Sequence, residues 1–393
     1  MITVQEAKLL LQHHLIQGPT IATPLLDALG YYLSEDIFAP IDIPSFDNSA
    51  MDGYAINWSS EPSRIVNIDK KIQAGDYGEK SESTKEAIRI FTGAPMPTGM
   101  DTVIPQEWVS LVGDQLTFEP EKFKKGANVR LKGAQNKKGD PIATAGSLIT
   151  PGMVGLLASV GLAEVNIYRQ PAVAVILTGN ELQQLGQPLV EGKIYDANGP
   201  VLKAYLHQLG IHNTKILFAQ DEPEALNKTI KEALSTHDIL LLSGGISVGD
   251  YDFVKSGLQQ AGVKELFYKV RQKPGKPLYI GQFKGEKWVF ALPGNPASTL
   301  TCFNQYVKPC IQAWMGQSQN FEPNGKFPLS ADYTKPPGLS FFLKAKVEAG
   351  KVHILEGQES FNLISYGNAN CIAEVDEHTA FIPAGEMVNV YFW

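Results

Sequence analysis

The sequence has 393 residues, 44% hydrophobic and 19% charged, a composition typical of a soluble globular protein rather than a disordered chain. Its length exceeds what one hydrophobic core supports, so we expect about two to four domains. The net charge of −7 without a long basic run argues against nucleic acid as a partner, and three scattered cysteines without a C-x-x-C pair argue against a disulfide framework or a zinc ribbon.

The first predicted element is a helix at the amino terminus, where Thr3 and Glu6 have the spacing of a capping box. Thr23-Pro24 predicts a second helix that ends near Gly30. The amino terminus has no basic segment followed by an apolar one, and no apolar run is long enough for a membrane. Because the scattered cysteines also favour a reducing compartment, we expect a cytoplasmic protein with no membrane partner.

A short polar loop follows at residues 46–55. It concentrates carboxylate, amide and hydroxyl groups between apolar flanks, with Asp47, Asn48, Ser49 and Asp52. Two interpretations stay open: the side chains bond to the nearby backbone of a turn, or they orient a polar ligand or a cation.

Residues 64–168 consist of short strand-like runs separated by Gly, Pro and Asp, which predicts a β-rich module. Thr92 ends one of these strands. Further along, Arg130 and Lys132 would share a face if that segment is extended. Thr150-Pro151 predicts a short helix near the end of the module.

From residue 171 the sequence alternates between strand-like and helix-like segments, which predicts a three-layer α/β/α domain with a mostly parallel sheet. Three polar loops each follow a predicted strand, at residues 178–181, 243–252 and 293–298. In such sheets ligands bind beyond the carboxyl ends of the strands. We therefore expect all three loops at one edge of the sheet.

The middle loop is rich in glycine and serine and ends in two carboxylates. Glycine lets the backbone approach an anion with its N–H groups, so the loop suits a phosphate or an oxyanion, but a tight turn without a ligand would look the same. Its candidate residues are Ser243, Gly244, Gly245, Ser247, Gly249, Asp250 and Asp252.

A dense basic segment follows at residues 269–276. If it is extended and its strand is central, Lys269, Arg271 and Lys273 project to one side and Lys276 joins them after Pro274-Gly275. This predicts a phosphate or oxyanion site, although a charged edge strand that discourages aggregation is the alternative.

Carboxylates follow several of the same strands. Together with Asp52 they suggest a hard cation, and Mg²⁺ prefers oxygen ligands of this kind. Asp221 alone could instead be a helix N-cap. No histidine falls in these loops, so covalent nucleophilic catalysis is not expected. The expected Mg²⁺ ligands are Glu181, Asp221 and Asp252.

After residue 319 short strands return, which predicts a small β domain at the carboxyl end. The expected division is a helical and extended linker domain (1–45 and 142–170), the β-rich module (46–141), the α/β domain (171–318) and the C-terminal β domain (319–393).

Six motifs resemble those of the MoeA-type molybdopterin molybdenumtransferases, to which the gephyrin E domain is related. They read FDNSAMDGYA, TGAPMP, TGNEL, SGGISVGDYDF, KPGKP and LPGNP, in that order, and they extend over nearly the whole chain. The resemblance implies that the α/β domain binds molybdopterin.

It also implies the last step of molybdenum cofactor synthesis: adenylylated molybdopterin and molybdate bind, molybdenum is inserted, and AMP leaves. An elongated homodimer with the active site shared between subunits is implied, with the molybdopterin adenylyltransferase as a further candidate partner. The site residues that we carry over are Asp52, Thr92, Arg130, Glu181, Asp221, Asp252, Lys269, Lys273, Pro293 and Pro296. With the loop residues above, the predicted catalytic residues are Asp52, Thr92, Glu181, Asp221, Asp252, Lys269 and Lys273. The predicted substrate-binding residues are Arg130, Ser243, Gly244, Gly245, Ser247, Gly249, Lys276, Pro293, Asn295, Pro296 and Ser298.

Two departures from the family pattern remove negative charge. Ala134 and Gln135 stand where the family has an acidic pair, and Asn180 replaces an aspartate. Asp250 is a candidate to compensate for this loss. The alternative function is a molybdopterin-binding carrier or scaffold without insertase activity, and AMP release distinguishes the two.

Overall fold

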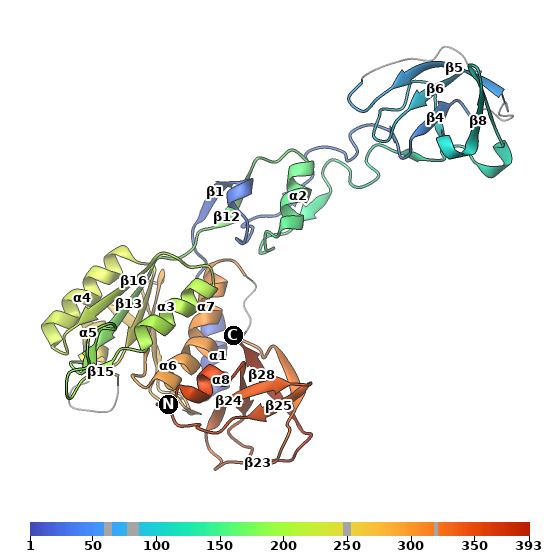
Figure 1. Ribbon diagram of the computed structural model, residues 1–393. Helices are drawn as coiled ribbons and strands as arrows, with labels where there is room; N and C mark the ends of the chain where they lie inside the picture. Colours follow the sequence, from blue (N-terminus) through green and yellow to red (C-terminus); the bar gives the residue numbers. More distant parts are fainter. Residues whose placement is uncertain (59–64, 77–85, 247–252, 318–320) are drawn as a thin grey trace.

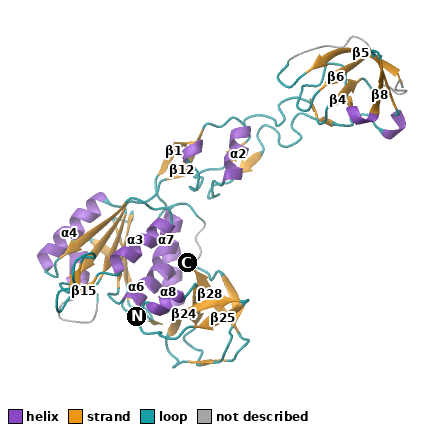
Figure 2. Cartoon of the chain, in the orientation of Figure 1, coloured by secondary structure: helices purple, strands orange, loops and turns teal. Residues whose placement is uncertain are grey.

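The computed structural model describes residues 1–58, 65–76, 86–246, 253–317 and 321–393. The molecule is elongated: the α/β domain and the C-terminal β domain lie together at one end with both chain termini, and the β-rich module lies at the other (Figure 1). A narrow segment joins the two ends. Most helices belong to the α/β domain, while the other two lobes consist mainly of strands (Figure 2).

The α/β domain is built on a six-stranded sheet with the order β16-β13-β17-β21-β20-β18. Its first four strands are parallel, and only β20 runs against its neighbours. Every residue of β13 and β17 is buried, which explains their nearly continuous apolar sequences. The mostly parallel sheet is confirmed, with β13 (Val173–Thr178), β16 (Thr214–Ala219), β17 (Ile239–Ser243), β18 (Val263–Tyr268), β20 (Tyr279–Phe283) and β21 (Lys287–Leu292).

Helices cover both faces of this sheet, so the three-layer prediction is also confirmed. One core lies under α4 and α5, and the other lies under α1, α3 and the α6–η4–α7 segment, whose middle turn is a π-helix. The bounds are α1 (Val4–His13), α3 (Asn198–Gln208), α4 (Pro223–Thr236), α5 (Phe253–Gln260), α6 (Pro296–Cys302), η4 (Phe303–Val307) and α7 (Lys308–Trp314).

The first helix has the predicted capping box: the Glu6 N–H donates to Thr3 Oγ1 and the Thr3 N–H donates to Glu6 Oε2. It packs into the core of the α/β domain through Val4, Ala7 and Leu11. This placement differs from the expected division of the chain, which put residues 1–45 in the linker domain. The helix lies far in sequence from the sheet that it covers, so no local pattern indicates the contact.

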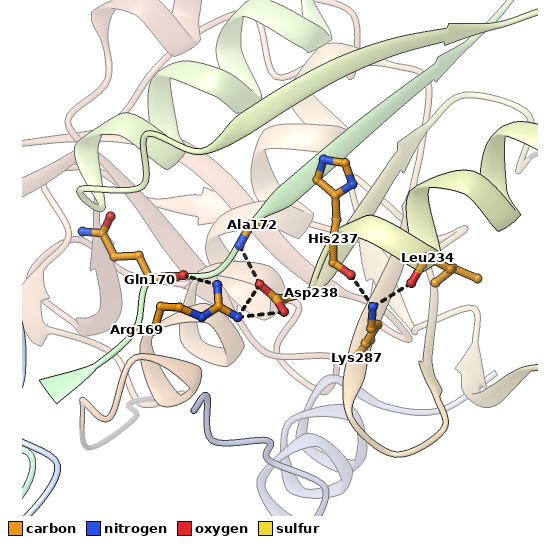
Figure 3. A network of polar contacts seen from close by, with 7 residues as sticks. All are labelled: Arg169, Gln170, Ala172, Leu234, His237, Asp238 and Lys287. Atoms are coloured by element: carbon orange, nitrogen blue, oxygen red, sulfur yellow. Dashed lines mark hydrogen bonds and ion pairs between the residues drawn. The ribbon is translucent and has the colours of Figure 1, made fainter. Parts of the chain in front are cut away.

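A polar network lies at the amino ends of β13 and β17 (Figure 3). Asp238 accepts hydrogen bonds from Arg169 Nη2 at 3.0 Å and from the Ala172 N–H at 2.8 Å. Close by, Lys287 Nζ donates to the carbonyls of Leu234 and His237 at 2.6 and 2.9 Å. The network holds the chain where it enters the sheet from the linker.

The linker consists of two short antiparallel strand pairs and one helix. The predicted helix from Thr23-Pro24 to Gly30 is wrong: residues 20–24 form a strand that pairs with β12 along its whole length, and only a 3-10 turn follows. The predicted helix after Thr150 is confirmed, and Thr150 Oγ1 accepts from the Met153 N–H. The bounds are β1 (Thr20–Pro24), η1 (Leu25–Asp27), β2 (Ile37–Phe38), β11 (Pro141–Ala143), α2 (Pro151–Ser159) and β12 (Glu164–Tyr168).

The module at the far end is β-rich, as predicted. Its six-stranded sheet has the order β7-β4-β6-β5-β9-β8, with an apolar cluster on each face. The bounds are β3 (Asn48–Ser49), β4 (Gly53–Ile56), β5 (Ile65–Ile72), β6 (Glu86–Ile90), β7 (Thr102–Pro105), η2 (Gln106–Trp108), β8 (Val109–Val112), β9 (Gln115–Phe118), η3 (Pro120–Lys122) and β10 (Val129–Arg130).

The C-terminal β domain shares a sheet with a strand from the α/β domain. β19 (Gln272–Lys273) pairs in parallel with β24, so the two domains are joined by backbone hydrogen bonds. The remaining elements are β14 (Leu182–Gln183), β15 (Ile194–Tyr195), β22 (Gly325–Pro328), β23 (Tyr333–Thr334), β24 (Ser340–Glu348), β25 (Lys351–Ile354), α8 (Ile364–Asn368), β26 (Cys371–Val375), β27 (Phe381–Ile382) and β28 (Met387–Phe392).

Candidate active site

A cavity of about 580 Å³ lies at the carboxyl edge of the parallel sheet. It is lined by the segments that follow β16, β13, β17 and β21, four neighbouring strands in the sheet order. The three polar loops therefore share one edge, as the sequence predicts. The predicted site residues that line the cavity are Glu181, Asp221, Ser243, Gly244, Gly245, Pro293, Asn295 and Pro296.

The described part of the glycine-rich loop packs against the end of β13. Gly244 has φ +97°, and a Cβ there would lie 2.5 Å from the Thr178 carbonyl oxygen. Gly245 has φ +63°, and a Cβ there would lie 2.8 Å from Val254 Cγ2. Both positions therefore need glycine for backbone conformation and for space. Ser247, Gly249, Asp250 and Asp252 lie outside the described residues.

Three carboxylates, those of Glu181, Asp196 and Asp221, give the cavity a negative character. Burial raises the pKa of Asp221 above its ordinary value, and the charge of Glu181 raises it further. The N-cap interpretation of Asp221 is wrong, because α4 begins after Glu222 and Asp221 lies one residue earlier. No lysine or arginine is among the lining residues that the structure describes.

Three buried oxygen atoms at this edge have no hydrogen-bond partner within the described residues: Thr178 Oγ1, Asn198 Oδ1 and Asp221 Oδ1. A buried polar atom without a partner is costly, so such atoms mark places where a ligand or an ion can complete the bonding. All three residues line the cavity. Within the same described ranges, no group of three or more His, Cys, Asp or Glu side chains is arranged to hold a metal ion.

Sequence reasoning missed Asp196 and Asn198, which line the cavity at the start of α3. Asn198 Nδ2 donates to Ser243 Oγ and to the Gly294 carbonyl, both at 2.8 Å, so it ties two of the loops together. Asp196 Oδ1 accepts from the Gly199 N–H at 3.0 Å. The available signal is the polar pair Asp196 and Asn198, which follows the short strand β15.

The basic segment does not have the predicted geometry. β18 is an edge strand rather than a central one, and it ends at Tyr268. Lys269 has φ +69°, so the segment turns instead of remaining extended. Lys269 Nζ lies 4.7 Å from the Tyr268 ring centroid, and Lys273 Nζ lies 5.2 Å from that of Phe341.

This segment still follows the carboxyl end of its strand, and Pro277 lines the cavity. Lys269, Lys273 and the exposed Lys276 are not among the lining residues, and neither is the buried Ser298.

Three further predicted residues lie in the distant module. Asp52 Oδ1 accepts from the Thr92 N–H and from Thr92 Oγ1, both at 2.8 Å, and these bonds lower the pKa of Asp52. Arg130 pairs with Asn48 across two short strands. Within one chain, the module lies at the opposite end from the α/β domain (Figure 1), whose sheet edge holds the cavity.

Three family models match the chain. Residues 2–161 match the MoeA N-terminal region (domains I and II), residues 174–313 match a probable molybdopterin binding domain, and residues 326–393 match the MoeA C-terminal region (domain IV). The first match includes α1, most of the linker and the distant module, and the other two correspond to the α/β domain and the C-terminal β domain.

Curated relatives extend over almost the same length. The molybdopterin molybdenumtransferase of Staphylococcus aureus (strain Mu50) is 34% identical over 399 residues, covering 99% of this chain and 95% of the relative. That of Haemophilus influenzae is 36% identical over 373 residues, covering 93% and 92%.

The fold is also found in a solved structure. The crystal structure of the molybdopterin biosynthesis MoeA protein from Pyrococcus horikosii has a TM-score of 0.85 and 30% identity, covering 100% of this chain and 99% of the other. These similarities show that the chain belongs to the MoeA family of molybdopterin molybdenumtransferases.

Proposed function

We propose that this chain inserts molybdenum into molybdopterin, with adenylylated molybdopterin and molybdate as substrates and AMP as a product. The observation that carries the proposal is the cavity at the carboxyl edge. Asp221, Glu181 and the described part of the glycine-rich loop line it, and buried oxygens there lack partners among the described residues. A carboxylate with a raised pKa in a cleft, such as that of Asp221, is typical of a functional site. A carrier protein could bind the same ligand, but it would not need carboxylates placed in the cavity for a reaction.

We propose Mg²⁺ as the cation at this site, held by Asp221 and Glu181, with Asp252 as a third candidate ligand. The donor set fits, because the Asp221 Oδ1 atom is buried without a partner in the described part of the chain and Mg²⁺ prefers oxygen ligands. Bound Mg²⁺ would neutralise phosphate charge. The chain itself would orient the ligand through Ser243 and Asn198. These two side chains are joined by a hydrogen bond from Asn198 Nδ2 to Ser243 Oγ.

We propose that the active site is shared within a homodimer. Asp52 and Thr92 form a compact hydrogen-bonded pair, yet the elongated chain holds them at the opposite end from its own cavity. A second copy could bring its module to the cavity of the first. Exposed apolar side chains on the linker support a contact there, with Ile21 at 41%, Leu26 at 82% and Leu29 at 52% exposure.

The proposed setting is the cytoplasm. All three cysteines are free and buried, as expected in a reducing compartment. Among the described residues, no helix has the length and apolarity that a membrane span requires. An adenylyltransferase must supply the adenylylated substrate, so we propose that enzyme as a transient partner.

AMP release tests the proposed function. The purified chain is given adenylylated molybdopterin, molybdate and Mg²⁺, and AMP is measured over time. Release that depends on both molybdate and the chain supports the insertase. Tight binding of the adenylylated compound without AMP release would instead favour the carrier.

Mixing inactive variants tests the shared site. Asp52→Ala and Asp221→Asn are each expected to be inactive. Mixed in equal amounts they should regain about a quarter of wild-type AMP release, because about half of all dimers are mixed and each mixed dimer carries one intact site of two. A wild-type chain that sediments as an active monomer at micromolar concentration would contradict the shared site.

A further inference from the structure

The cavity has one wall from another domain. Phe361 belongs to the loop between β25 and α8 of the C-terminal β domain, and it lines the cavity. The adjacent residue Ser360 fixes the loop to the start of α6: its Oγ accepts from Asn295 Nδ2 and its carbonyl accepts from the Ala297 N–H, both at 3.0 Å. Asn295 lines the same cavity, so the two bonds hold Phe361 beside the ligand loops.

A buried lysine determines the shape of this loop. Lys344 is only 3% exposed, and its Nζ donates to the carbonyls of Gly357, Glu359 and Asn362 at 2.5, 3.1 and 3.0 Å. Burying an ammonium group is expensive unless its hydrogen bonds are made, so this loop conformation is strongly favoured over alternatives. Gln358 adds two bonds with the Lys344 backbone.

Phe361 nevertheless exposes its ring. The residue is 69% exposed, and no ring in the described part of the chain packs against it. A single exposed apolar residue is ordinary on a mobile surface, but here the loop is fixed by buried bonds and ends at a polar cavity. The loop thus presents a preformed aromatic surface next to carboxylates and glycine.

We propose that Phe361 stacks on a flat nitrogen heterocycle of the ligand, with Lys344 as a positioning residue. This rests on the proposed function, because the proposed substrate contains two such rings, a pterin and an adenine. Stacking on an aromatic side chain suits either ring, since every such base has a π-face.

Titration calorimetry with the full chain tests the proposal, with AMP and a pterin phosphate as separate probes. For Phe361→Ala we expect the Kd of one probe to rise by about tenfold while the other is unchanged, and the affected probe identifies the ring. Phe361→Trp should bind like the wild type, and Phe361→Leu should bind like the alanine variant. In AMP release, Phe361→Ala should raise KM and leave kcat nearly unchanged.

The matched control is Phe381→Ala, which removes another exposed phenylalanine of the same domain, 55% exposed, from a strand that does not line the cavity. Unchanged affinity of Phe361→Ala for both probes, or a leucine variant that binds like the wild type, would overturn the stacking proposal alone. A wild-type chain that binds neither probe and releases no AMP would overturn the proposed function as well.

Discussion

The amino and carboxyl edges of the central sheet differ in whether their buried polar groups have hydrogen-bond partners among the described residues. At the amino edge, Asp238 and Lys287 have their charges satisfied by a side chain and by backbone groups (Figure 3). At the carboxyl edge, Thr178, Asn198 and Asp221 each keep a buried oxygen without a partner among the described residues. The first arrangement stabilises the fold, and the second leaves bonding capacity for a ligand.

This contrast predicts that substitutions at the two edges separate stability from activity. The largest effect is expected for Asp221→Asn. It removes the buried carboxylate, so AMP release should fall by about a hundredfold or more. The matched control is Glu222→Gln, which changes the neighbouring N-cap residue outside the cavity and should keep its activity.

Asp221→Asn should also change how the melting temperature of the protein depends on pH. Since burial and Glu181 raise the pKa of Asp221 in the folded chain, the ionised carboxylate destabilises the metal-free protein once the pH exceeds that pKa. Asp221→Asn should therefore melt about 1–2 °C higher than wild type at pH 7, and the difference should vanish below about pH 4. A lower melting temperature at pH 7 without metal would contradict this assignment.

The basic segment at residues 269–276 lies near the carboxyl edge, and its lysines are predicted to bind the phosphorylated ligand. Lys269→Ala and Lys273→Ala should each weaken binding of the phosphorylated ligand by about 1.5–3 kcal/mol, the range for a charge-assisted hydrogen bond. Calorimetry measures the affinity, and thermal melting checks the fold. Lys284→Ala is the control, since Lys284 lies 5.2 Å from the Phe283 ring centroid but in the turn between β20 and β21, at the amino edge. Wild-type affinity in both variants would show that these lysines lie outside the site.

Breaking the amino edge should have the reverse result. Asp238→Ala removes the partner of Arg169 and leaves the Ala172 N–H without an acceptor, which should cost about 2 kcal/mol of unfolding free energy. Denaturant unfolding measures the loss, and kcat for AMP release should remain close to that of wild type. For comparison, Glu119→Ala removes an exposed ion pair with Lys122 and should cost about 0.5 kcal/mol or less. A marked fall in kcat of the folded Asp238→Ala protein would contradict this and would connect the amino edge to the active site.

The smallest expected effect concerns Gln135. Its side chain is exposed in the segment that leads out of the distant module, and its N–H donates to the Ile43 carbonyl at 2.8 Å. If relatives use a carboxylate there to support Mg²⁺, the double change Ala134→Glu and Gln135→Asp should lower the Mg²⁺ concentration for half-maximal AMP release by about threefold. Identical Mg²⁺ dependence of the two proteins would show that the substitution is silent.

The sequence predicted the parts of the fold that depend on local pattern. The continuous apolar runs of β13 and β17 indicate buried parallel strands, and the loops after them indicate the edge where the cavity lies. The capping box and the motif after Thr150 predicted two helix starts correctly.

The parts that depend on distant contacts could not be predicted in this way. Thr23-Pro24 suits a helix start or a strand end, and pairing with β12 decides for the strand. Nothing in the sequence signals the positive φ of Lys269, a residue that rarely adopts it. Asn198 can be identified as a candidate site residue only from its hydrogen bonds to Ser243 and Gly294, which are far away in the sequence.

The distant module also has a consequence for chain connectivity. The Ile43–Asn136 bridge and the pairing of β2 with β11 place its entry and exit segments side by side. The module is thus an insertion within the linker, and the linker in turn separates α1 from the sheet that α1 covers. In a nested layout of this kind, the outer module can be lengthened, exchanged or lost in evolution while the inner strand pairs and the cavity keep their own connections.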